Sequence, residues 1–277
     1  MAKRILIQTT IPPVEDDWHV GRFSILASHL RSLGHEVVAR NRELGADPVL
    51  TVLDQGGFDQ LWLFAVDVGD GLSAEECAAI GRFRESGGGL LVTRDHQDLG
   101  CSVCTLGGVG KAHHFHTTNP EPDEGRRRRD DQDTRDIDWP NYHSGSNGDF
   151  QSIRVEDPSH PLLADGMGGL LAFLPSHPHE GAVSAPIDEP DAHVIATGIS
   201  QASGAPFNLI VAFEGRGGGG RAVAQSTFHH FCDYNLDPRT GCPSFVSEPP
   251  SDRILSDPRG RRAADRYFQN LAEWLSP

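Results

Sequence analysis

The stretch from Gly87 to Cys104, GGGLLVTRDHQDLGCSVC, constrains the fold of this chain more than any other. Three glycines lead into the five residues 90–94, which predict a short buried strand, and a polar turn carrying Asp95, His96 and Asp98 follows directly. Ionisable side chains placed just after a buried strand are typical of the carboxyl edge of a parallel sheet, where α/β proteins bind ligands. We therefore expect an α/β protein with a site at the end of this strand.

Strand and helix patterns alternate on both sides of this stretch. Strands are predicted at 4–8, 37–39 and 58–66, and helices begin near Val20 and after a Ser73/Glu76 capping box. Further strands are expected at 153–155, 192–197, 207–213 and 221–225, and a last helix starts at Asp257–Pro258. The order β-α-β indicates a flavodoxin-like, doubly wound α/β fold whose sheet is mostly parallel.

The segment from about 101 to 152 interrupts this pattern. It is rich in Gly, Asp, Arg, Asn and His, shows little periodicity, and is too long for an ordinary connection. We interpret 1–277 as a single domain with a loop-rich insertion at 101–152, either a lid over the strand edge or a partly mobile loop.

Charge and composition restrict the partners. The formal charge of −15 argues against nucleic acid, and the basic run Arg126–Arg129 is flanked by acidic residues, so we interpret it as a solvated loop. The N-terminus is too weakly apolar for a signal peptide, and no stretch could span a membrane. Five cysteines, an odd number, fit a reducing compartment. We expect a cytoplasmic protein with a small-molecule substrate and no membrane partner; homo-oligomerisation is left open.

Histidines are the main candidates for chemistry. There are 14, and several sit with acids in three strand-end loops: RDHQD, LPSHPHEG and STFHHF. Imidazole and carboxylate groups are common ligands of transition metals, so the loops predict a shared metal site. The candidate ligands are His96, His177, His179, Glu180, His229 and His230, and the candidate acid–base groups are Asp95, Asp98 and Glu180. Zinc is favoured, with iron, manganese or copper as alternatives.

Each of these histidines also has a plain structural interpretation, as a capped or exposed side chain. Adjacent histidines such as His229 and His230 would point to opposite faces of a continuing strand, so only one of them should face the site. The tract at 113–116, HHFH, can bind metal or can equally be a solvated segment.

Other motifs carry less information. Cys101 and Cys104 form one CxxC pair without the second pair of a zinc ribbon, and plain packing is the favoured interpretation. The run at 215–220, GRGGGG, lacks the Lys-Ser/Thr of a phosphate-binding loop and precedes a strand, so it indicates a hairpin-like connection.

The run from FDQLWLF through SAEECAAIGRFRESGGGLLVTRDHQDLG resembles the class I glutamine amidotransferase-like superfamily, in particular its ThuA-like (trehalose-utilisation) branch. The resemblance covers about the first hundred residues and the motif near His229. It implies the flavodoxin-like fold, and it links the chain to chemistry on sugars. In amidotransferases the turn after GGGLLV carries a nucleophilic cysteine, whereas here it reads Thr93, Arg94, Asp95, His96. LPSHPHEG and STFHHFCDYNL also resemble motifs of bacterial members of this group, which implies that His179, Glu180 and His229 share one edge.

Together these patterns lead to three hypotheses. The first is a metal-dependent enzyme, a hydrolase or an isomerase/lyase, that acts on a small polar molecule such as a carbohydrate derivative. It would work by hydrolysis or by proton transfer next to a carbonyl. The second is a non-catalytic module on the same scaffold that binds a metal or a small molecule. The third is a cysteine-dependent amidohydrolase that uses Cys101.

Overall fold

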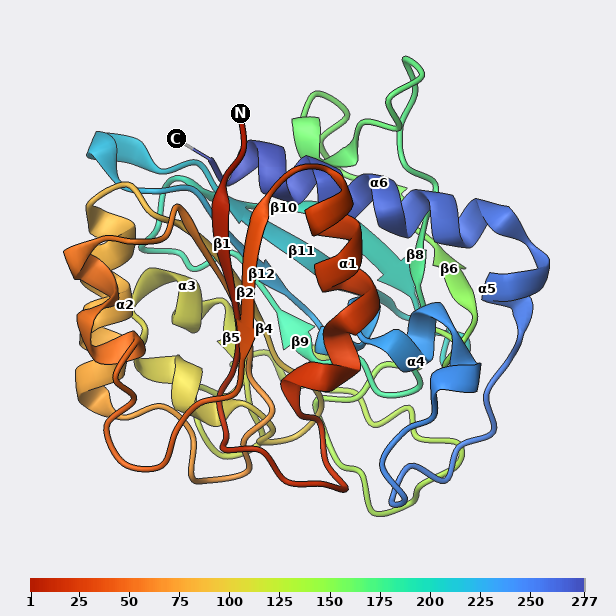
Figure 1. Ribbon diagram of the computed structural model, residues 1–277. Coiled ribbons are helices and arrows are strands. Elements are labelled where there is room, and N and C mark those ends of the chain that lie inside the picture. Colours follow the sequence, from red (N-terminus) through yellow and green to blue (C-terminus); the bar gives the residue numbers. More distant parts are fainter. Residues whose placement is uncertain (277) are drawn as a thin grey trace.

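The computed structural model describes residues 1–276 and contains one eight-stranded mixed sheet in the order β2-β1-β3-β4-β12-β11-β10-β7 (Figure 1). Its strands are β1 (Arg4–Thr9), β2 (Glu36–Arg40), β3 (Gln60–Phe64), β4 (Gly89–Thr93), β7 (Arg154–Val155), β10 (Ala192–Ile199), β11 (Pro206–Phe213) and β12 (Ala222–Gln225). The strands from β2 to β12 run parallel, and β11, β10 and β7 continue the sheet antiparallel. This is the α/β flavodoxin-like architecture expected from the sequence, with an antiparallel extension.

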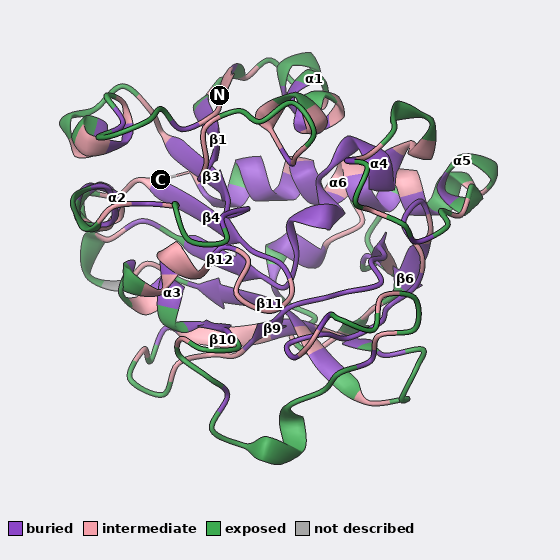
Figure 2. Ribbon diagram, turned by 90° about the horizontal axis from the view of Figure 1, so that it is seen from below, coloured by how far each residue is buried: buried purple, intermediate pink, exposed green. Residues whose placement is uncertain are grey.

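Helices cover both faces of the sheet. They are α1 (Ser24–Ser32), α2 (Ala74–Glu85), α3 (Gly108–Lys111), α4 (Asp233–Leu236), α5 (Arg253–Ser256) and α6 (Pro258–Trp274). Successive residues of a strand face opposite sides, and β3 shows this clearly: Trp62 and Phe64 pack with α1 and α6, whereas Leu61 and Leu63 pack with α2. Buried strands thus fill the middle, and exposed residues lie on the outer helix faces and outer loops (Figure 2).

Local signals start the helices where the sequence predicts them. Ser73 and Glu76 form the expected capping box at α2, and Asp257 caps α6 with Pro258 in its first turn.

The two glycine runs of the sequence lie against each other because β4 and β12 are neighbours. A Cβ on Gly220 would lie 1.9 Å from the carbonyl oxygen of Gly88, so only glycine fits this approach. The GRGGGG run joins antiparallel β11 and β12, as the hairpin interpretation predicts.

The segment 101–152 is mostly irregular, and much of it packs against the body of the protein. It contains α3, β5 (His113–His114) and β6 (Phe150–Ser152); β5 pairs with β9 (Ala182–Val183), and β6 with β8 (Phe173–Pro175). The solvated interpretation of the HHFH tract is wrong for His113 and His114, which are buried, and correct only for His116. Residues 122–129, with the arginine run, are exposed. No helix among residues 1–276 is long and apolar enough to cross a membrane.

Candidate metal centre

Three chain segments meet at the carboxyl edge of the sheet. Strands β4 and β12 are paired so that Thr93 lies beside Gln225, and this register brings Asp95 and Thr227 side by side two residues further on. A 3-10 helix that begins after Thr227 carries His229. His177 and His179 arrive from the loop that follows β8. The three strand-end loops singled out in the sequence therefore converge.

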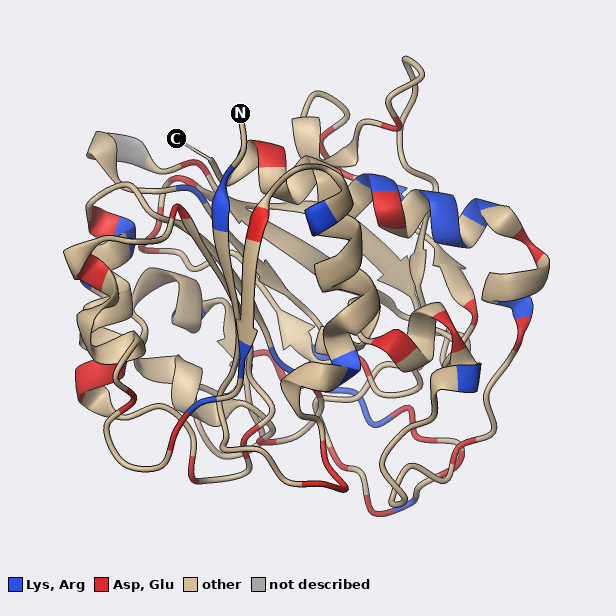
Figure 3. Cartoon of the chain, in the orientation of Figure 1, with Lys and Arg blue, Asp and Glu red and all other residues tan. Residues whose placement is uncertain are grey.

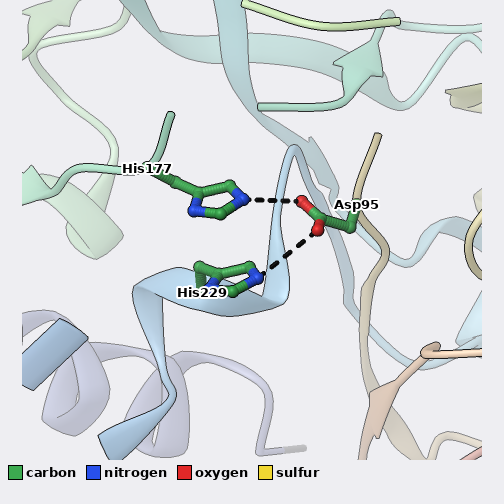
Figure 4. Close-up of side chains that lie close together, drawn as sticks. All are labelled: Asp95, His177 and His229. Atoms are coloured by element: carbon green, nitrogen blue, oxygen red, sulfur yellow. Dashed lines mark ion pairs between the residues drawn. The ribbon is translucent and has the colours of Figure 1, made fainter. Parts of the chain in front are cut away.

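Asp95, His177 and His229 form a compact group of three buried side chains, and their ligand atoms all lie within 4.8 Å of one another. The Nε2 atom of His177 is 3.3 Å from Asp95 Oδ1, and the Nε2 atom of His229 is 3.4 Å from Asp95 Oδ2. The two imidazoles are stacked with ring centroids 3.5 Å apart and planes 8° from parallel. Figure 4 shows both rings directed at the same carboxylate.

Two asparagines decide which nitrogen of each imidazole carries the proton. The side-chain amide nitrogen of Asn235 donates to the carbonyl of Ser176 at 2.6 Å and to Asn147 Oδ1 at 3.1 Å. A backbone carbonyl can only accept, so this fixes both amide orientations. Asn147 Oδ1 is then left to accept from His177 Nδ1 at 3.0 Å, and Asn235 Oδ1 from His229 Nδ1 at 3.1 Å. Both rings therefore carry hydrogen on Nδ1.

The consequence is that in the neutral rings both Nε2 lone pairs face a carboxylate. His177 Nε2 is buried and has no hydrogen-bond partner of good geometry. A cation between the three groups would convert this repulsion into attraction. Donor atoms at about 2.0–2.1 Å from a tetrahedral metal stand about 3.4 Å apart, and the two nitrogen–oxygen separations, one to each oxygen of Asp95, are close to that value. The residues present therefore fit a divalent transition metal.

Electrostatics couples the three groups. Burial by itself raises the pKa of Asp95, but the imidazoles of His177, His229 and His96 hold it well below its usual value. Burial lowers the pKa of His177 well below 6.5, with the adjacent His229 adding to the effect. Burial opposes the charged form of His229 too, yet Asp95 raises its pKa to about 10. Two stacked imidazoles thus do not both accept a proton, and the carboxylate stays ionised.

Arg94 and Thr227 hold the turn that carries Asp95 in place. Arg94 is fully buried, lies over the ring of Phe115, and donates to the carbonyls of Gln97, Leu99 and His114. Burial lowers the pKa of Arg94 to about 9, which still leaves it charged at neutral pH. Thr227 accepts from the backbone N–H of His229 and donates to Asp95 Oδ1 at 3.0 Å. Thr227 therefore helps to position both the backbone of His229 and the carboxylate of Asp95.

His96 and His179 stand next to this group. His96 Nε2 is 3.7 Å from Asp95 Oδ2, and burial lowers the pKa of His96 to about 4, so it is neutral at pH 7. His179 packs edge-on against both His96 and His177, at centroid separations of 5.4 and 5.6 Å. Its Nε2 donates to Glu248 Oε1 at 2.8 Å, and its Nδ1 is buried without a partner. Burial opposes ionisation of Glu248, but hydrogen bonds from His179 and Thr134 lower its pKa to about 2.

A cavity of about 530 Å³ opens above these groups. Asp98, a predicted acid–base residue, lines it and accepts from the backbone N–H of Thr117. Thr134 and Ile137 show that the 101–152 insertion supplies part of the wall, and Phe245 closes another side. The complete lining comprises Asp17, Trp18, Val66, Val68, Asp95, His96, Gln97, Asp98, Leu99, His116, Thr134, Ile137, His177, His179, His229, Phe245, Val246 and Glu248.

Two of the predicted site residues, Glu180 and His230, are not brought to this cavity. They form a buried pair, with His230 Nε2 2.9 Å from Glu180 Oε1. Glu180 also accepts from Ser144, Gln151 and Ser226, so its carboxylate is already fully engaged. Of the adjacent histidines, only His229 faces the cavity, as expected, although they sit in a 3-10 helix and not in a strand. We leave Glu180 and His230 out of the candidate metal centre.

A second group, His160, His193 and Glu214, has similar spacing but different hydrogen bonding. His160 Nδ1 accepts from the backbone N–H of Leu162, so the neutral ring carries its hydrogen on Nε2, the atom that faces Glu214 at 3.3 Å. The Nε2–H of His160 is therefore directed towards a carboxylate that can accept it, although the two atoms do not form a hydrogen bond of good geometry. In the neutral ring His160 thus presents a hydrogen to Glu214, whereas His177 presents a lone pair to Asp95.

Cys101 begins a 3-10 helix beyond the polar turn, packs partly against the core, and does not line the cavity. Burial raises the pKa of its thiol, and the carboxylates of Asp67 and Asp98 raise it further. Both effects disfavour a thiolate.

The sequence alone did not identify Asn147, Asn235 and Glu248. Asn235 is six residues after His229 in the short helix α4, which is a local signal that could have been used. Asn147 and Glu248 lie in irregular segments with no distinguishing pattern.

Comparisons with known proteins bear on the fold. No protein-family profile matches the sequence, and no curated protein matches it. Among the solved structures that resemble the chain are the following three. The mmIFT52 N-terminal domain has a TM-score of 0.51 at 13% identity, covering 84% of this chain and 89% of its own. The glutaminase domain of Trypanosoma brucei CTP synthase with bound acivicin has a TM-score of 0.53 at 14% identity, covering 98% and 94%. A ThuA-like protein from Parabacteroides merdae has a TM-score of 0.53 at 15% identity, covering 99% and 90%.

The chain has the fold of class I glutamine amidotransferase domains. At these identities the likeness concerns the fold, and it agrees with the resemblance found in the sequence.

Proposed function

We propose that this protein is a metal-dependent enzyme that acts on a small polar molecule by hydrolysis or by proton transfer next to a carbonyl. The observation that carries the proposal is the pair of imidazoles whose Nδ1 hydrogens are committed to Asn147 and Asn235. In the neutral rings the Nε2 atoms are therefore bare, and they face the Asp95 carboxylate at 3.3 and 3.4 Å; a metal ion would displace the proton that His229 carries on Nε2 at neutral pH. A donor set oriented in this way, with the outer nitrogen of each ring hydrogen-bonded, is typical of metal-ligating histidines.

His177, His229 and Asp95 would hold the ion, and His96 would offer a fourth donor from beside the carboxylate. Two imidazoles and one carboxylate suit zinc and also non-haem iron, while manganese and copper remain alternatives. Zinc is our first choice because the two nitrogen–oxygen separations suit a tetrahedral site.

When bound, such an ion lowers the pKa of a water molecule or polarises a substrate carbonyl. The chain would supply the proton transfers. Glu248 accepts the Nε2 hydrogen of His179, which leaves His179 Nδ1 bare and able to take a proton from a group in the cavity. Asp98 lines the same cavity and is a second candidate base. The apolar side chains of the lining would exclude water around the reacting groups.

A cavity of about 530 Å³ suits a small molecule. The likeness to a ThuA-like protein favours a carbohydrate derivative, by analogy of fold. The likeness to a glutaminase domain raises the cysteine-dependent alternative. Cys101 is a poor candidate nucleophile because it lies outside the cavity lining and its thiol pKa is raised. A non-catalytic metal-binding module is the remaining alternative.

The test is metal analysis of the full chain purified without a histidine tag. We expect close to one transition-metal ion per chain, and His229→Ala should remove most of it. His29→Ala is the matched control, because His29 lies outside the cavity and belongs to neither group of possible metal ligands, so the metal content should be unchanged. A metal content near zero after gentle purification and metal add-back would refute the proposal. Metal binding with no turnover across a panel of sugar and amide substrates would favour the binding module.

A further inference from the structure

Among the Asp, Glu, Lys and Arg side chains, only acidic ones line the cavity in the described part of the chain. Four carboxylates line it, from Asp17, Asp95, Asp98 and Glu248, and no lysine or arginine does so among the described residues. Asp95 would be neutralised by a bound cation, and His179 pairs with Glu248. Asp17 and Asp98 remain as uncompensated acids, apart from the half-exposed His116 at 3.7 Å from Asp98. Figure 3 shows acidic segments along the loops at the lower edge of the molecule, where the carboxyl ends of the parallel strands lie.

The arginines nearest to the cavity are committed elsewhere. Arg94 directs its guanidinium away from the cavity, to the backbone carbonyls of Gln97, Leu99 and His114. Arg22 lies 5.8 Å from the ring of Trp18 and donates to the backbone carbonyls of Asp17 and Gly241. Neither arginine lines the cavity.

The rest of the lining is apolar. Trp18 and Val66 are buried at the inner end of the cavity, and Phe245 is 60% exposed at its rim. This wall continues outwards, since a second cavity of about 940 Å³ shares Asp17, Val66 and Val68 with the first. An exposed phenylalanine at the rim of a cavity is a large apolar surface available to a ligand.

From these observations we infer that the site selects ligands that carry an apolar group and no negative charge away from the metal-binding atoms. Phosphorylated or carboxylated substrates are disfavoured, and neutral or cationic ones are favoured. An anionic substituent would face Asp17 and Asp98 with no lysine or arginine in the described lining to compensate it, whereas an apolar one would lie against Trp18 and Phe245. This inference rests on the proposed function, since it names the substrate class of the same site.

Hydroxamates test the inference, because they bind metal ions and can carry a remote substituent. Dissociation constants would be measured on the zinc-loaded full chain for acetohydroxamate, benzohydroxamate and the para-carboxy and para-aminomethyl forms of the latter. We expect benzohydroxamate to bind more tightly than acetohydroxamate, and the para-carboxy form at least about tenfold more weakly than the para-aminomethyl form.

Two variants assign the effects to residues. The double variant Asp17→Asn/Asp98→Asn should reduce the difference between the charged forms to a few-fold, and Asp252→Asn, an exposed acid outside the lining, should leave it unchanged. Phe245→Ala should reduce the difference in affinity between benzohydroxamate and acetohydroxamate. Equal or tighter binding of the para-carboxy form would overturn the inference.

The metal content of the same samples separates this inference from the proposed function. If the protein holds no metal, binding of benzylamine and of benzoate to the metal-free chain would be compared by ligand-observed NMR. A preference for benzylamine would then uphold the charge selection although the metal proposal had failed. If the protein retains metal but binds the para-carboxy hydroxamate in preference, the charge selection is refuted and the metal proposal stands.

Discussion

Replacing Asn235 by leucine tests the argument that two asparagines prepare the imidazoles for a metal. Leucine has nearly the same volume but cannot accept the hydrogen of His229 Nδ1, which is 3.1 Å from Asn235 Oδ1. It also removes the donor that fixes the orientation of Asn147, and thereby weakens the control of His177. Both rings would then be free to place hydrogen on Nε2, the nitrogen that must be bare to bind a cation.

Loss of such an outer hydrogen bond typically weakens metal binding by about 10–100-fold. This corresponds to about 1.4–2.8 kcal/mol of binding free energy. Because one substitution here affects both imidazoles, we expect a value near the upper end. Asn147→Leu acts on His177 alone and should cost less than Asn235→Leu.

The assay is competition for zinc against a chromophoric chelator, with thermal melting of the metal-free proteins as a check on folding. Asn235 is fully buried, so the Asn235→Leu substitution should lower the stability of the metal-free chain as well, by about 1–3 kcal/mol for the unpaired Ser176 carbonyl. The His29→Ala variant serves as the reference for an altered histidine outside the cavity and outside both groups of possible metal ligands. A folded Asn235→Leu protein with unchanged zinc affinity would refute the reasoning from hydrogen-bond orientation.

Three further predictions concern other parts of the chain. Glu180→Ala should lower the free energy of unfolding by about 3–5 kcal/mol in urea denaturation, because it leaves His230 buried without its partner, and Glu180→Gln should cost less. Once a substrate is found, activity should survive Cys101→Ala with a modest loss and disappear with a chelator; the reverse pattern would restore the cysteine mechanism. Trypsin should cut first within Arg126–Arg129, because this run is exposed and the surrounding segment, about 120–138, buries little apolar surface. Protection equal to that of the core strands would contradict this.

Much of the fold could be predicted because it depends on local patterns. The strands β1, β3 and β4 consist of short apolar runs, and their periodicity distinguishes them from the helical stripe of α6. The capping box at Ser73 and the Asp257–Pro258 start are contained within a few residues. The antiparallel extension of the sheet was not predicted, because strand direction is set by pairing between distant residues.

The sequence by itself determined that Asp95, His96, His177, His179 and His229 follow strands and can meet at one edge. It could not separate His229 from His230, because a 3-10 turn directs one to the cavity and the other to Glu180. Nor could it predict that Glu180 lies in the interior, away from the cavity, and that Glu248 lies at the site. Only the tertiary structure decided which of these side chains form the site. It also decided how the imidazoles are oriented, because the hydrogen bond between Asn147 and Asn235 joins residues 88 positions apart. The protonation of both imidazoles depends on that contact, and packing across the whole domain brings it about.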